Sequence, residues 1–125
     1  MTFGYTILYV DDVAKTLEFY ERAFGLKTCM NMGNYGELET GSTTLSFAER
    51  ALATEHLGVE PKKGDTVPFP FEIAFTTKDV PSAYDAAIQA GCVSISAPSQ
   101  KPWGQTVSYV RDCNGFLVEI CSPIS

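Results

Sequence analysis

The stretch 6–26, TILYVDDVAKTLEFYERAFGL, decides most of the fold. Its first residues are β-branched and aromatic, which is typical of a half-buried strand, and the run stops at an Asp-Asp pair. Asp12 can accept hydrogen bonds from backbone N–H groups in a first helical turn. Apolar residues then recur at steps of three and four, and Gly25 suits a left-handed helix end. The pattern predicts a strand over 3–10 and a helix that begins at Val13.

The rest of the chain repeats this beginning. Strand-like runs at 27–32, 35–40 and 43–48 complete a βαβββ unit. After a charged segment the same order returns, with runs at 71–77, 92–96, 105–111 and 116–121 and a helix from Asp79 to Gly91. An internal repeat constrains architecture more strongly than local propensity does. The prediction is a single domain over 1–125, made of module one (1–49), a connector (50–69), whose first half could form a short helical turn, and module two (70–125).

The composition narrows the classes of function. A chain of 125 residues with 45% hydrophobic residues is the size of one domain and can bury a core. Nine Lys and Arg against fifteen Asp and Glu give a formal charge of −6, which disfavours phosphate backbones and anionic lipid. No run is apolar enough for a membrane span, and the start does not resemble a signal peptide. We therefore expect a cytoplasmic protein without nucleic-acid or membrane partners.

Histidine and cysteine usage restricts the chemistry further. The only histidine is His56, in the connector, where a surface position is expected. Chemistry that requires two imidazoles from one chain is therefore excluded. The four cysteines have no CxxC spacing, so neither a zinc knuckle nor a disulfide framework is predicted.

Two segments resemble the vicinal oxygen chelate superfamily, which includes glyoxalase I, bleomycin-resistance proteins and extradiol dioxygenases. The stretch 6–26 is similar to the opening strand, Asp cap and helix end of that family. The stretch 103–120, WGQTVSYVRDCNGFLVEI, is similar to its closing hairpin, with Cys113 in place of the usual proline. The resemblance covers nearly the whole chain. It implies an α+β fold in which two βαβββ modules form an eight-stranded half-open cup with helices on the outside, and a homodimer.

The resemblance also implies where a family metal site would lie, on the first, fourth, fifth and eighth strands. The matching residues here are Tyr5, Ser46, Glu72 and Glu119. Metal-dependent members usually have histidine at the positions of Tyr5 and Glu72, so only Glu119 matches. A neutral phenol and a hydroxyl are poor ligands for a borderline divalent ion. We expect no metal or other cofactor, with a hard divalent ion held by Glu72 and Glu119 as the alternative.

Strand alternation predicts which side chains line the cup. The candidate ligand-binding residues, including a loop tryptophan near the cup's mouth, are Tyr5, Ile7, Tyr9, Ser46, Glu72, Trp103 and Glu119. The two glutamates interrupt apolar strands, which costs desolvation energy unless they meet a partner. They are interpreted as a remnant of a lost metal site, as a site for a cationic or polar ligand, or as a catalytic pair.

The leading functional hypothesis is metal-independent binding of a small molecule, with a cation favoured because the protein is acidic. Aromatic side chains in the cup would add stacking surface. The alternative is a glyoxalase-like lyase or isomerase in which Glu119 or Glu72 removes a proton beside a carbonyl, with or without a divalent metal. A third hypothesis is a relic whose cleft binds nothing of consequence.

Overall fold

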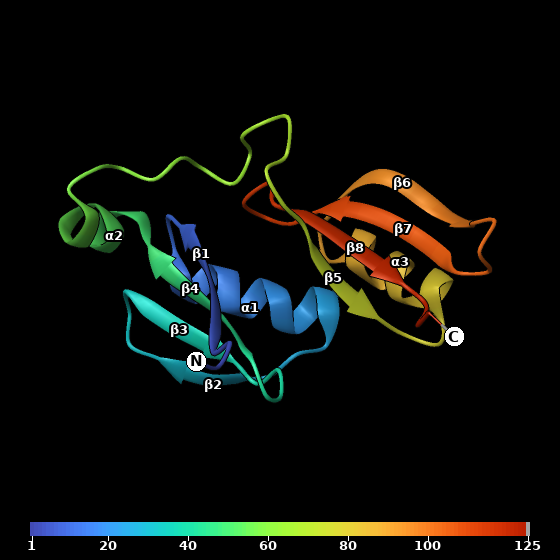
Figure 1. Ribbon diagram of the computed structural model, residues 1–125, viewed down its shortest axis with the longest axis horizontal. Coiled ribbons are helices and arrows are strands. Elements are labelled where there is room, and N and C mark those ends of the chain that lie inside the picture. Colours follow the sequence, from blue (N-terminus) through green and yellow to red (C-terminus); the bar gives the residue numbers. More distant parts are fainter. Residues whose placement is uncertain (125) are drawn as a thin grey trace. The chain divides into compact units, whose positions relative to one another are not determined.

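The computed structural model describes residues 1–124, and the chain forms two compact units that divide between Gly64 and Asp65 (Figure 1). Unit one contains β1 (Tyr5–Val10), α1 (Val13–Phe24), β2 (Thr28–Asn31), β3 (Tyr35–Leu38), β4 (Thr44–Glu49) and α2 (Arg50–Leu57). Unit two contains β5 (Ile73–Thr76), α3 (Val80–Gln89), β6 (Val93–Gln100), β7 (Thr106–Arg111) and β8 (Leu117–Cys121). The predicted α+β class with two βαβββ modules is confirmed. The cup and the single-domain organisation stay predictions.

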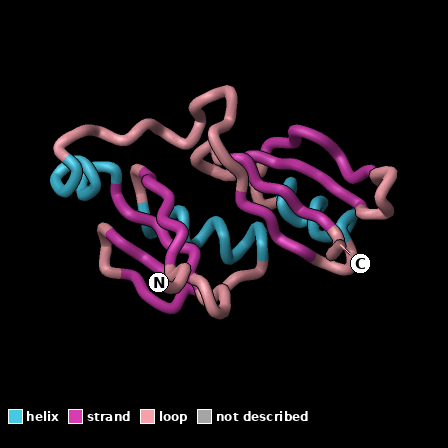
Figure 2. The backbone as a smooth tube through the Cα atoms, viewed as in Figure 1, coloured by secondary structure: helices cyan, strands magenta, loops and turns pink. Residues whose placement is uncertain are grey.

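Each unit has one four-stranded sheet, with strand order β1-β4-β3-β2 in unit one and β5-β8-β7-β6 in unit two. The first strand of each unit pairs in parallel with its last strand, and the other neighbours are antiparallel. In Figure 2, α1 and α3 each lie along one face of their own sheet. The opposite face of each sheet is not covered by that helix and is therefore the face available for a binding site.

Side-chain caps fix the starts of the two main helices as predicted. The Asp12 carboxylate accepts from the backbone N–H of Lys15 at 3.0 Å, and α1 ends at Gly25 with a φ of 69°. Asp79 accepts in the same way from the N–H of Ser82 at 3.2 Å. These caps satisfy N–H groups that have no partner within a helix, so the two copies begin their helices by the same device.

Strand alternation places the apolar core between each sheet and its helix. The buried strand residues on the helix side include Leu8, Val10, Leu45, Phe47, Val118 and Ile120. In unit one the packing is so close that a Cβ at Gly36 would lie 2.6 Å from Cδ1 of Leu17 and 3.1 Å from Cγ1 of Val13. Glycine at position 36 is what allows α1 to rest on β3.

Residues 50–57 of the predicted connector form α2, which agrees with the helical turn considered for that segment. The structure differs from the predicted elements in two places. β5 begins at Ile73, so Glu72 stands just before the strand. β6 continues to Gln100, through a segment expected to be loop, and its pairing with β7 shifts register around Ser96. Such irregularity is tolerated because β6 is an edge strand.

Arg50, the first residue of α2, ties the chain that leaves unit one back to the sheet. Its guanidinium donates to Asp11 at 3.0 Å, to Glu60 at 2.7 Å and to the carbonyl oxygen of Pro61.

No helix in the described part of the chain has the length and apolarity needed to cross a membrane.

Candidate functional site

Glu119 is placed by the alternation of β8. Its neighbours Val118 and Ile120 are buried against the helix side, so Glu119 points to the open face of the sheet. In the sheet register Glu119 lies between Ala74 of β5 and Tyr109 of β7. The small side chain of Ala74 on one side leaves room beside the carboxylate.

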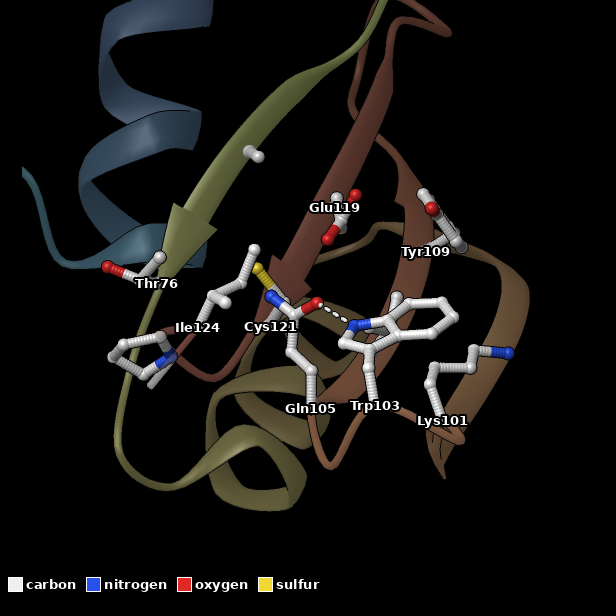
Figure 3. Close-up of a pocket in the computed structure, with 11 residues that line it drawn as sticks. Thr76, Lys101, Trp103, Gln105, Tyr109, Glu119, Cys121 and Ile124 are labelled. Atoms are coloured by element: carbon white, nitrogen blue, oxygen red, sulfur yellow. Dashed lines mark hydrogen bonds between the residues drawn. The ribbon is translucent and has the colours of Figure 1, made fainter.

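A pocket of about 580 Å³ opens on this face of unit two (Figure 3). It is large enough for a small organic molecule. The lining residues that bear on its chemistry are Ala74, Trp103, Gln105, Tyr109, Glu119 and Cys121. Apart from Glu119 and a lysine, Lys101, the walls offer aromatic, aliphatic and neutral polar groups.

A second carboxyl group reaches Glu119 from the residue before β5. Glu72 hydrogen-bonds to Glu119, and this bond, with burial and repulsion between the two charges, raises the pKa of Glu72 to about 7. Burial by itself would raise the pKa of Glu119 as well. Hydrogen bonds with Glu72, Cys121 and Tyr109 outweigh burial, and the pKa of Glu119 is lowered. At neutral pH Glu119 is therefore ionised, whereas Glu72 is protonated in only part of the molecules.

The two other groups in contact with Glu119 stay neutral. Burial, followed by the charges of Glu119 and Glu72, raises the pKa of the Tyr109 phenol to about 12. Burial and the hydrogen bond to Glu119 raise the pKa of the Cys121 thiol to about 11. Cys121 is therefore a thiol at neutral pH and a poor nucleophile, and it donates to the carbonyl oxygen of Phe75 at 3.7 Å. The neutral Tyr109 hydroxyl can donate to the carboxylate.

The open face of unit one holds the other predicted residues. Tyr5 and Ile7 are 57% and 44% exposed, whereas Ser46 is fully buried and donates to the carbonyl oxygen of Thr6 at 3.4 Å. A pocket of about 390 Å³ in this unit is lined by Ile7, Tyr9, Tyr35, Ala48, Leu52 and His56, among others. The expected surface position of His56 agrees with its exposure, and its ring borders this pocket.

Unit one also contains a tyrosine–glutamate pair that the sequence analysis missed. The hydroxyl of Tyr35 donates to Oε2 of Glu37 at 2.7 Å, and burial raises the pKa of Tyr35. Both residues alternate with buried or glycine positions in β3, so strand parity was the available signal. Counting back from the turn of the closing hairpin would likewise have set Tyr109 opposite Glu119.

The structure thus divides the predicted site residues between the two units. Glu72, Glu119 and Trp103 belong to unit two, where the two carboxyl groups interact and Trp103 lines the pocket. The remaining predicted residues, Tyr5, Ile7, Tyr9 and Ser46, belong to unit one.

Residues 3–125 match the family model described as a glyoxalase-like domain. The chain belongs to this family. It is 29% identical over 117 residues to the Bacillus subtilis (strain 168) protein YraH, with 90% of this chain and 91% of that protein covered.

Solved structures of the same superfamily share the fold of this glyoxalase-like chain. A glyoxalase-related enzyme from Fulvimarina pelagi has a TM-score of 0.86 at 18% identity, covering 98% of this chain and 88% of that one. A glyoxalase/bleomycin resistance protein/dioxygenase family enzyme from Burkholderia phytofirmans PsJN has a TM-score of 0.82 at 20% identity, covering 95% and 96%. The predicted membership in the vicinal oxygen chelate superfamily is confirmed.

The residues of this glyoxalase-like chain do not fit the histidine-based metal centre that the resemblance implies. Tyr5 offers a phenol, the hydroxyl of Ser46 is buried and donates to a backbone carbonyl, and Glu72 is hydrogen-bonded to Glu119. Within residues 1–124, no three His, Cys, Asp or Glu side chains form a group that could hold a metal ion. The donor set therefore consists of oxygen atoms without an imidazole, and Ser46, Glu72 and Glu119 already have partners.

Proposed function

We propose that this glyoxalase-like protein binds a small organic cation, without a metal, in the pocket of unit two. The observation that carries the proposal is the carboxylate of Glu119, which is ionised at neutral pH inside an aromatic-lined pocket. A charge in such a place is costly unless hydrogen bonds or a counter-ion compensate it. Glu72 and the Tyr109 hydroxyl supply part of the compensation, and a bound cation would supply the rest.

The second carboxyl group strengthens this preference for cations. Glu72 loses its proton at about pH 7, so a bound cation can favour ionisation of Glu72 and then interact with two carboxylates. Affinity for a cation should therefore increase as the pH rises through 7. The overall charge of −6 favours the approach of positive ligands in the same sense.

The test is calorimetric titration of benzamidinium into the wild type and into Glu119→Gln. An amidinium forms paired, charge-assisted hydrogen bonds with a carboxylate, and losing them should weaken binding about tenfold. Glu37→Gln removes the same charge from a strand of unit one and is the matched control, expected to leave the affinity unchanged. Equal affinity in Glu119→Gln and wild type would refute the proposal.

Proton transfer is the second candidate function, because Glu72 titrates near neutral pH in contact with Glu119. A carboxyl group with a pKa close to the working pH is an effective general base for a proton beside a carbonyl. Protein treated with a chelator would be assayed by NMR for exchange of that proton in 2-oxoaldehyde–thiol adducts. Exchange that disappears in both Glu72→Gln and Glu119→Gln would favour this function, and exchange that survives both would exclude it.

A homodimer, a cytoplasmic location and the absence of nucleic-acid partners remain part of the proposal. The acidic composition supports the last of these. Sedimentation of the purified protein would test the dimer.

A further inference from the structure

We propose that the pocket of unit two selects flat aromatic cations over aliphatic cations of the same charge, and that Gln105 is the positioning residue responsible. This inference rests on the proposed binding function. It adds the class of ligand and a residue that acts through a neighbour, Trp103, rather than through contact with the charge.

Trp103 stands on the loop between β6 and β7 and is 65% exposed. An indole so exposed has few packing contacts to restrict its rotamer, and ordering a mobile side chain on binding costs free energy. Here the ring is held by a hydrogen bond instead. Its Nε1–H donates to Oε1 of Gln105 at 2.8 Å, the dashed line in Figure 3.

Gln105 is itself fixed at its other end. Its Nε2 donates to the backbone carbonyl oxygen of Ser122 at 2.8 Å. Ser122 follows β8 directly and is bound twice to Thr106, through the Ser122 N–H at 2.9 Å and through the Ser122 hydroxyl, also at 2.9 Å. The chain of hydrogen bonds therefore runs from the indole to the end of the strand that carries Glu119.

The backbone of the loop that carries Trp103 is also held by hydrogen bonds. The N–H of Lys101 donates to the carbonyl oxygen of Gln105 at 2.8 Å, and the N–H of Gly104 donates to that of Lys101 at 2.9 Å. Gly104 has a φ of 94°, which residues with a Cβ rarely adopt. Trp103 thus sits on a short turn whose two ends are joined.

This arrangement determines what the indole can offer a ligand. Its only polar hydrogen is already bound to Gln105, so the ring contributes its aromatic face to the wall of the pocket. A flat aromatic cation gains both stacking on that face and the charge of Glu119. An aliphatic cation gains only the interaction with the charge of Glu119. Because the indole is already fixed, a flat ligand gains the stacking energy without the cost of ordering the ring.

The test compares benzamidinium with cyclohexanecarboxamidinium, which carries the same charged group on a puckered ring. Wild-type protein should bind benzamidinium about fivefold more tightly. Gln105→Met, similar in volume and unable to bridge Trp103 and Ser122, should reduce that preference to about twofold or less, by weakening benzamidinium alone. Trp103 is the only tryptophan in the chain, so its fluorescence anisotropy decay should show a faster local motion in this variant.

Trp103→Phe, which keeps an aromatic ring but lacks the N–H, should show a similar loss of preference by calorimetry. Adding Gln105→Met to it should change nothing further. Equal weakening of both amidinium ions by Gln105→Met, or no weakening of either, would overturn the inference. Wild-type protein that binds neither ion would instead refute the proposed function, and wild-type protein that binds both equally would refute the flat-ligand selectivity alone.

Discussion

The two units use the same strand pairings, yet the glutamate of the equivalent cross-strand pair lies on a different strand in each unit. Where β3 pairs with β4, Glu37 faces Ser46; where β7 pairs with β8, Tyr109 faces Glu119. Unit one engages Glu37 with the hydroxyl of a tyrosine from its own strand. Unit two has its acid on β8, the partner of the parallel strand β5, where it interacts with a second carboxyl group and lines a larger pocket.

This difference shows that strand pairing alone does not determine which unit can hold an ionised side chain on its sheet. Ser46 and Glu119 occupy corresponding positions of the last strand, but Ser46 is fully buried and Glu119 is not. The surroundings of each position, rather than its place in the sheet, determine whether an ion is tolerated.

Exchanging these residues should have the largest effect. Ser46→Glu places a carboxylate where no side chain is exposed, and it should lower the free energy of unfolding by about 3 kcal/mol or more. Glu119→Ser should change stability by less than about 1 kcal/mol, because the hydrogen bonds that Glu119 loses are offset by the end of its repulsion with Glu72. Urea denaturation followed by circular dichroism measures both. Similar losses in the two variants would show that the units are equally intolerant.

A smaller effect is expected where the helix meets the sheet. Gly36→Ala forces a Cβ against Leu17 and should cost about 1–3 kcal/mol. The corresponding position in unit two accepts a side chain, since buried Ser108 donates to the carbonyl oxygen of Ile120 at 2.8 Å. Ser108→Ala should therefore cost only about 1 kcal/mol, the value of one hydrogen bond. Thermal melts of both variants would contradict this if Ser108→Ala were the more harmful.

The smallest effect concerns pH. The pKa of Glu72 is raised on folding, from 4.5 to about 7, so the stability it contributes is complete below pH 4.5 and is lost as the pH rises through 7. Glu72→Gln keeps a neutral donor to Glu119, and it should raise the melting temperature by about 2–4 °C at pH 8 and flatten its dependence on pH between 5 and 8.

Glu55→Gln removes one charge from an exposed position of α2 and is the control for net charge. It should leave the pH profile of the melting temperature unchanged. A profile for Glu72→Gln that parallels the wild type would show that the two carboxyl groups do not share a proton.

The sequence was sufficient for features that depend on local chemistry. The caps at Asp12 and Asp79 and the buried faces of β4 and β8 follow from residue type and period alone. The predicted strand ends at residue 96, whereas β6 continues through Pro98 to Gln100. Its place at the edge of the sheet, which only the tertiary structure determines, makes that proline acceptable.

The candidate site was predictable only in outline. Alternation put Glu119 on the open face, but it could not show that Glu72 would reach it, nor that Ser46 on the same parity would be covered. The bond between Trp103 and Gln105 depends on two side-chain rotamers and on the turn that brings them together. Such contacts between side chains have no period in the sequence.

The parallel pairing of the first and last strands of each unit bears on how the protein is made. β1 leaves the ribosome before β4, and among residues 1–124 β4 is the strand that pairs with it, after α1 and two other strands. Until Glu49 has been synthesised, one edge of β1 can find no native neighbour, and the second unit repeats the delay between β5 and β8. Pairings so distant in sequence form slowly. The nascent chain therefore passes twice through a stage in which an apolar strand waits for its partner, and chaperones that bind extended apolar segments would meet it at those two stages.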